Sequence, residues 1–276
     1  MANKVYDYVT QRILEELEKG VIPWKKPWFT TKVNYVSRRP YHGINLLLLP
    51  EPGEYLTFNQ VNKLGGKIKK GSNSHMVTFF KILEKEERND KGELETKTKK
   101  IPLLRYYRVF HLDDVEGIDS KLEEPEGIDT DQKAEEIINN YQNKPKIEIK
   151  KSDRAYYSPV KDRVVCPDKK QYKIKEQYYG TLFHELVHST GHKRRLNRFD
   201  TENLAAFGSK TYSFEELIAE IGSSMLLSKS GMDLNKTVKN SASYIKGWSE
   251  KLKNNRTMIV QAAGKAQKAA EHITGE

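Results

Sequence analysis

Residues 182–188 read LFHELVH and contain the pattern HExxH, in which three residues separate two histidines. If this stretch is helical, His184 and His188 lie on one face about one turn apart, so both imidazoles can reach one ion. A hydrolytic zinc site uses three protein ligands and leaves a fourth position to water, whose pKa falls to about 7 on binding. Glu185 lies between the two histidines, where its carboxylate can accept a proton from the bound water. The stretch therefore predicts a Zn²⁺ site of the metallopeptidase type with Glu185 as the general base.

The third ligand is not supplied by the residues that directly follow. A metzincin places a third histidine at position 194, where this chain has Arg194. His192 continues the four-residue spacing, but it lies about 12 Å along a straight helix from His184, too far to share its ion. We therefore interpret His192 as a residue at the rim of the site and expect the third ligand further along the chain.

Residues 213–225, SFEELIAEIGSSM, predict a helix with one apolar face and an opposite stripe of carboxylates and small residues. Such a stripe is typical of a glutamate-type zincin, in which one Glu binds the metal and a second carboxylate holds a ligand histidine. We assign Glu216 to the metal and Glu220 to the second role, although the two could be exchanged. Glu215, about 100° around the helix from Glu216, is the less favoured ligand.

The length and composition of the chain limit the class of protein to which it can belong. The chain has 276 residues, which favours two domains over one. No stretch approaches the ~18–20 consecutive apolar residues of a membrane span, and the first residues lack the apolar run of a signal peptide. We therefore expect a cytoplasmic protein with no membrane partner. A single cysteine, Cys166, excludes a disulfide within the chain.

The net charge of +10 is unevenly distributed along the chain. Residues 1–82 carry 13 Lys/Arg against 6 Asp/Glu, residues 83–140 carry 10 against 17, and residues 141–276 carry 25 against 15. Two basic blocks therefore flank an acidic segment. A basic block suits contact with a polyanion such as nucleic acid, although it can also serve solubility alone.

The pattern along the chain predicts an α+β protein. Apolar residues recur every four positions from Val5 to Leu17, which predicts a helix that ends at Gly20. Short strands and a small helix are expected between residues 24 and 83, and the polar stretch 84–100 is expected to be a loop or the tip of a long hairpin. The proposed boundaries are a small α+β domain (1–118), an acidic linker (119–132) and a mainly helical domain (133–276).

Long blocks in both halves resemble ArdC-type antirestriction proteins. In the second half, FHELVHSTGHKRRLNR (183–198) and FGSKTYSFEELIAEIGSSML (207–226) resemble the family's zincin-like metallopeptidase domain. In the first half, YLTFNQVNKLGGKIKKGSNSHMVTFFK (55–81) resembles its single-stranded-DNA-binding domain. The resemblance implies a protein of mobile elements, such as plasmids or integrative conjugative elements, that protects incoming single-stranded DNA from host restriction. A host defence factor is a possible protein substrate.

The first half also has the chemistry that single-stranded DNA requires, because cations for phosphates alternate with rings on which bases stack. The stretches WKKPW (24–28) and RRPYH (38–42) place rings beside cations, and three lysines surround glycines in residues 65–71. The candidate phosphate contacts are Lys25, Lys26, Arg38, Arg39, Lys67, Lys69 and Lys70. The candidate stacking residues are Trp28 and Tyr41.

Three functions compete on these residues. The first is a zinc-dependent antirestriction protein that binds single-stranded DNA and hydrolyses peptide bonds. The second is a protein that protects DNA by occlusion alone and holds a structural metal. The intact Glu185 argues against this second function, because a structural site needs no base. The third is a metallonuclease, which is disfavoured because such enzymes prefer clustered carboxylates and Mg²⁺ or paired metals.

Overall fold

The computed structural model describes residues 2–25, 32–88, 94–122, 129–199, 210–237 and 242–276. The α-helices are α1 (Ala2–Glu18), α2 (Ile44–Leu48), α3 (Phe58–Lys63), α4 (Thr130–Asn140), α5 (Lys175–Ser189), α6 (Lys210–Lys229), α7 (Ala242–Asn254) and α8 (Met258–Thr274). The short 3₁₀ turns are η1 (Pro23–Lys25), η2 (Leu112–Asp114), η3 (Lys169–Gln171) and η4 (Leu234–Thr237). The strands are β1 (Lys32–Asn34), β2 (Gly53–Thr57), β3 (Lys67–Ile68), β4 (His75–Arg88), β5 (Leu94–His111), β6 (Val115–Glu116), β7 (Lys146–Lys150), β8 (Tyr156–Ser158) and β9 (Arg163–Pro167). The expected α+β class is confirmed.

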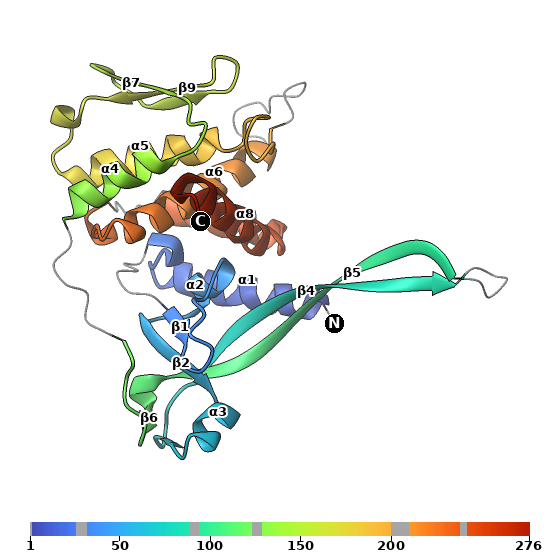
Figure 1. Ribbon diagram of the computed structural model, residues 1–276. Coiled ribbons are helices and arrows are strands. Elements are labelled where there is room, and N and C mark those ends of the chain that lie inside the picture. The colour runs from blue at the N-terminus through green and yellow to red at the C-terminus, as the bar shows by residue number, and fades with distance from the viewer. Residues whose placement is uncertain (1, 26–31, 89–93, 123–128, 200–209, 238–241) are drawn as a thin grey trace.

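The first half is built on a four-stranded sheet of order β1-β2-β5-β4. Strands β4 and β5 pair antiparallel from His75↔Val109 outward to Arg88↔Leu94, so the polar stretch 84–100 lies in a long hairpin, one of the two forms expected for it. Figure 1 shows this hairpin extending away from the helices. Residues 89–93, which join the strands, lie outside the described residues.

Three polar side chains stabilise this half. Gln60 and Thr57 form a capping box at the start of α3, which is the helix-capping role that a Gln at this position favours. Asn45 of α2 instead bonds the outer edge of β4: its side chain accepts from the backbone N–H of Thr78 (2.7 Å) and donates to the carbonyl of Thr78 (2.9 Å). Asn45 therefore satisfies the unpaired backbone groups of an edge strand.

The second half combines helices with a three-stranded sheet of order β7-β9-β8. The sheet lies beside α5, whose buried side chains include Tyr179, Phe183 and Leu186. Helices α5 and α6 approach closely because α6 has Gly222 at their contact, where an added Cβ would lie 2.9 Å from the side chain of Val187. This close approach brings the two segments predicted to hold a metal side by side.

The hydrophobic core does not follow the predicted domain boundaries. Helix α1 begins and ends as its four-residue period predicts, with Gly20 at a positive φ of 80° just beyond it. Its apolar face, including Val9 and Ile13, joins one buried cluster with α5, α6, α7 and α8. Figure 1 shows α1 and α2 lying beside α8. The division into residues 1–118, 119–132 and 133–276 therefore stays a prediction, whereas the core is shared.

None of the helices in the described ranges combines the length and the apolar composition that a transmembrane span requires.

Candidate metal centre

The three predicted metal ligands come together at the contact of α5 and α6. The Nε2 atoms of His184 and His188 lie 3.1 Å apart. One carboxylate oxygen of Glu216 lies 3.5 Å from His184 Nε2, and the other lies 3.3 Å from His188 Nε2. One ligand atom from each residue fits within 4.8 Å of the others, and the described residues contain no second group of three or more metal-ligating side chains as close. Two imidazoles and one carboxylate are a donor set that Zn²⁺ prefers in hydrolytic sites.

A second carboxylate, Glu215, lies behind His188. Its Oε1 is 3.5 Å from His188 Nδ1, the ring nitrogen that faces away from the ligand cluster. The guanidinium of Arg198 donates two hydrogen bonds to Glu215, of 2.7 and 3.2 Å. Arg198 also donates to Thr190 Oγ1 (2.6 Å) and to the carbonyl of Val187 (3.0 Å) at the end of α5. Glu215 therefore orients His188, and Arg198 holds Glu215 in place.

The tight loop after α5 returns Arg198 to the site. The backbone N–H groups of Arg198 and Phe199 both donate to the carbonyl of Gly191, at 2.8 and 3.0 Å. A Cβ on residue 191 would lie 2.6 Å from the ring of Phe199, so only glycine permits this packing. Gly191, two residues beyond the end of α5, thus allows the loop to close.

The carboxylates change the pKa of the groups around them. Burial alone would lower the pKa of His188, but Glu215 and Glu216 outweigh it and raise that pKa to about 9. Burial would raise the pKa of Glu215, yet His188 and Arg198 hold it below its usual range. Glu216 likewise has its pKa lowered by the two histidines in spite of burial. Both carboxylates therefore stay ionised, which favours a cation at the centre of the cluster.

Glu220 lies against groups other than the histidine predicted for it. Its carboxylate accepts a hydrogen bond from Trp24 Nε1 (3.0 Å) and another from the hydroxyl of Tyr244, and no contact to either histidine is found for it. Glu220 lies one turn further along α6 than Glu216, about 6 Å. There its carboxylate is directed towards η1 and α7. The second carboxylate that contacts His188 is Glu215.

Sequence reasoning missed the roles of Glu215 and Arg198. Adjacent glutamates point in directions about 100° apart, so only one of them was expected at the site. The crossing of α5 and α6 places them on two sides of His188. A signal was present, because an arginine ten residues after His188 is a suitable partner for a second buried carboxylate, but its sequence distance gave no reason to pair it with Glu215.

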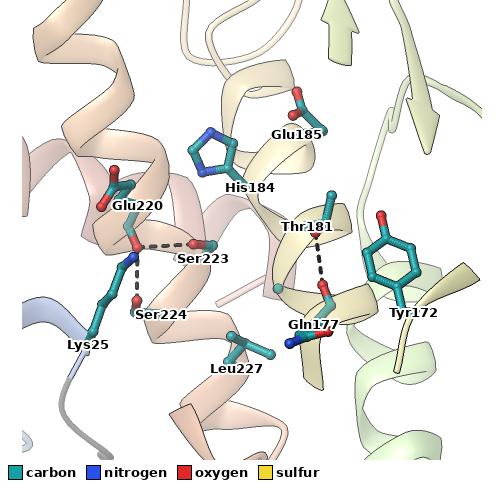
Figure 2. Close-up of a pocket in the computed structure, with 11 residues that line it drawn as sticks. Lys25, Tyr172, Gln177, Thr181, His184, Glu185, Glu220, Ser223, Ser224 and Leu227 are labelled. Carbon is teal, nitrogen blue, oxygen red and sulfur yellow. Dashed lines mark hydrogen bonds between the residues drawn. The ribbon is translucent and has the colours of Figure 1, made fainter. Parts of the chain in front are cut away.

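A cavity of about 570 Å³ opens beside His184 and Glu185, between α5 and α6. Figure 2 shows His184 and Glu185 at one end of this pocket and Gln177 and Leu227 at the other. The remaining lining residues are Lys25, Tyr172, Gly180, Thr181, Glu220, Ser223 and Ser224. Lys25 comes from the first half of the chain, so both halves build the wall of the pocket.

Two further residues near the site have defined positions. Tyr212 precedes Glu216 by one turn of α6. Burial, and then the charge of Glu216 and a hydrogen bond to it, raise the pKa of Tyr212 to about 12. Its hydroxyl therefore stays protonated at neutral pH. His192 is not a rim residue, because only 7% of it is exposed and its Nδ1 lies 3.9 Å from a carboxylate oxygen of Asp162.

The predicted DNA contacts separate into three groups. Arg38, Arg39, Lys67, Lys69 and Lys70 are exposed, as a phosphate contact requires. Lys25 is half-buried over the ring of Tyr244 (4.6 Å), and Tyr41 is half-buried edge-on against Tyr55 (6.0 Å). Lys26 and Trp28 lie outside the described residues.

Arg38 pairs with a buried carboxylate instead of facing solvent alone. Its Nη1 donates to Glu54, whose side chain has 0% exposure. Burial would raise the pKa of Glu54, but hydrogen bonds from the Lys121 backbone, Ser120 and Arg38 keep it below its ordinary value. We therefore assign Arg38 first to stability, and its role as a phosphate contact stays a prediction.

Arg38→Ala is expected to lower the free energy of unfolding at pH 7 by about 1–3 kcal/mol, since it removes a charged partner of a buried carboxylate. A carboxylate whose pKa is lower in the folded protein stabilises the fold at pH values above its unfolded-state pKa of about 4.3. This contribution is lost as the pH falls. The difference from wild type in urea denaturation should therefore shrink below about pH 4. Arg39→Ala, next to it and exposed, is the control and should keep wild-type stability. Equal losses in both variants would contradict the assignment.

Two family models match the chain. Residues 3–110 match the N-terminal domain of the anti-restriction factor ArdC, and residues 132–265 match a zincin-like metallopeptidase domain. The two matches fall on the two halves described above. The second match contains His184, Glu185, His188 and Glu216.

Related sequences align with almost the whole chain. The protein y4eC of Sinorhizobium fredii is 30% identical over 97% of this chain and 90% of its own length. Two proteins of Escherichia coli named DNA primase TraC are each 28% identical over 97% of this chain. The chain spans only 20% and 27% of those two proteins.

Solved structures extend the similarity to the fold. The metal-free crystal structure of the antirestriction protein ArdC from plasmid R388 superposes with a TM-score of 0.77 at 33% identity, covering 97% of this chain and 96% of that one. The Mn(II)-bound structure of the same protein gives 0.76 at 31% identity, covering 98% and 97%. A relative of the same architecture thus binds a divalent metal ion.

Proposed function

The chain belongs to the ArdC family of antirestriction proteins, and from this premise we propose that it binds single-stranded DNA through its first half and carries a Zn²⁺-dependent peptidase site in its second. The observation that carries the proposal is the cluster of His184, His188 and Glu216 with Glu185 on the same helix. The wider role is protection of incoming single-stranded DNA of a mobile element from restriction, as during conjugation.

His184, His188 and Glu216 would hold the ion, and Glu215 would keep His188 oriented through its Nδ1–H. Zn²⁺, when bound, supplies a Lewis acid that polarises a peptide carbonyl and lowers the pKa of water. Glu185 takes the proton from the attacking water and passes it to the departing amine. Tyr212, protonated at neutral pH, can donate a hydrogen bond to the oxygen on which negative charge develops.

The pocket supports a protein substrate more than a nucleic acid at this site. Its wall combines hydroxyl and amide groups with Leu227, and Lys25 is the one cation among the lining residues that the structure describes. A phosphodiester would require more positive charge next to the metal. The substrate in this proposal is a protein, such as a host defence factor, which the DNA-binding half brings near the site.

Glu185→Ala tests the enzymatic part of the proposal. The variant keeps all three metal ligands, so it is expected to bind Zn²⁺ and single-stranded DNA as wild type does but to lose protection of DNA in a restriction challenge. A labelled oligonucleotide titrated at several salt concentrations measures DNA binding, and survival of the challenged DNA measures protection.

Full protection by Glu185→Ala would favour the second candidate function, in which the protein occludes DNA and the metal is structural. Loss of DNA binding by the variant would mean that the metal site and the DNA surface are one. His192→Gln, outside the ligand cluster, is the matched control and is expected to protect DNA.

A further inference from the structure

One face of the β4–β5 hairpin carries two exposed aromatic side chains beside an arginine. Phe79 is 51% exposed and Tyr107 is 50% exposed. Arg105 is also exposed and lies on β5, opposite Phe79 and two residues before Tyr107. Large exposed rings that gather on one surface mark an interaction site more often than chance solvent exposure. The metal centre and its pocket do not involve this surface.

The register of the hairpin places these three side chains on the same face. Phe79 pairs directly with Arg105, and Val77 pairs directly with Tyr107, with no irregularity between His75 and Glu86. Directly opposed residues of an antiparallel pair share a face, as do residues two apart on one strand. Phe79 and Tyr107 are therefore diagonal neighbours, about 7–8 Å apart, with Arg105 next to both.

The same face of the hairpin is buried where it joins the body of the molecule, and this burial holds the adjoining residues of the hairpin in place. Val77 and Val109 belong to a core cluster with Leu49 and Tyr55. Phe79 and Tyr107 continue this face directly beyond the cluster, where the hairpin leaves the body of the molecule (Figure 1). The rings are thus held by a paired backbone without being covered.

We propose that Phe79, Tyr107 and Arg105 form the base-stacking surface on which the first half holds single-stranded DNA. The inference rests on the proposed function, which assigns single-stranded DNA binding to this half. Rings interleaved with cations match the ligand, because bases stack on the rings while phosphates contact the guanidinium.

Fluorescence anisotropy with a labelled oligothymidine, which has no structure of its own, tests the proposal in the full-length protein. Phe79→Ala and Tyr107→Ala are each expected to weaken binding by about 5-fold to 150-fold, the range for the loss of one stacked base. Their dependence on salt should match that of wild type. Arg105→Gln should instead reduce the slope of log affinity against log salt by about 0.7, because one phosphate contact is lost.

Tyr106→Ala is the matched control. Tyr106 is 54% exposed but pairs with Thr78 and so lies on the opposite face of the same hairpin. It should bind within twofold of wild type. If wild type binds and Phe79→Ala and Tyr107→Ala bind equally well, the surface is wrong while the proposed function stands. If wild type itself does not bind, the proposed function fails. Sedimentation that shows a dimer in wild type and a monomer in Tyr107→Ala would also overturn the proposal.

Discussion

Glu216→Ala is expected to lower the affinity for Zn²⁺ by more than about 100-fold, beyond the 10-fold to 100-fold typical of a residue that only supports a ligand. The carboxylate of Glu216 reaches both histidines, at 3.5 and 3.3 Å, so its removal takes away the only anionic ligand of the cluster. Competition with a chromophoric zinc chelator measures the change. The same variant should lose protection of DNA, because the peptidase chemistry that we propose depends on the ion.

Glu220→Gln is the control that separates the two glutamates. Glu220 lies on the same helix, and glutamine keeps an acceptor for Trp24 and Tyr244. Its Zn²⁺ affinity is expected to stay within about threefold of wild type, since the side chain contacts neither histidine. A large loss in Glu220→Gln with near-wild-type affinity in Glu216→Ala would show that the ligand is assigned to the wrong glutamate, which is the exchange that the sequence left open.

Arg198→Ala is expected to lower the free energy of unfolding of the metal-free protein by about 3–5 kcal/mol at pH 7. Arg198 donates twice to Glu215, and these side chains are only 7% and 16% exposed. Its removal leaves an ionised carboxylate buried with His188 as its remaining charged partner. Urea denaturation in the presence of a chelator measures the loss without any contribution from the metal. Zn²⁺ affinity should fall by about 10-fold to 100-fold as well, because His188 is less firmly oriented.

The pH dependence checks the cause of this loss. Glu215 has a pKa below its ordinary value in the folded protein, so its contribution is present above about pH 4.3 and disappears as the pH falls. Wild type and Arg198→Ala should therefore converge in stability at acid pH. Arg194→Ala removes an exposed arginine of the same loop and is expected to stay within about 0.5 kcal/mol of wild type. A loss below about 1 kcal/mol in Arg198→Ala would contradict the proposed support of Glu215.

The sequence by itself determined the features that depend on local periodicity. The spacing of His184 and His188 places both on one helix face wherever that helix lies, because 3.6 residues make a turn. The four-residue period from Val5 to Leu17 and the glycine after it likewise define α1 without reference to the rest of the fold. Long blocks of similar residues were enough to identify the family.

Only the tertiary structure decided which side chains surround those histidines. Glu215, Glu216 and Glu220 are the same residue type on one helix. Their different surroundings follow from the crossing of α5 and α6 at Gly222. The same holds for Arg198, which reaches Glu215 only because a tight loop closes over Gly191. Such contacts join residues that are far apart in the sequence, so they depend on how whole helices pack and not on the spacing within either one.

The first half shows the same division. Its sequence combines rings with cations throughout, but it does not say which rings the core takes. Trp24 and Tyr55 are fully buried, whereas Phe79 and Tyr107 remain half exposed on the hairpin. Burial of a ring is determined by the elements that pack over it, and α1 packs against the C-terminal helices to form a single core with them. The exposed surface is what that packing leaves uncovered, which no local pattern of residues records.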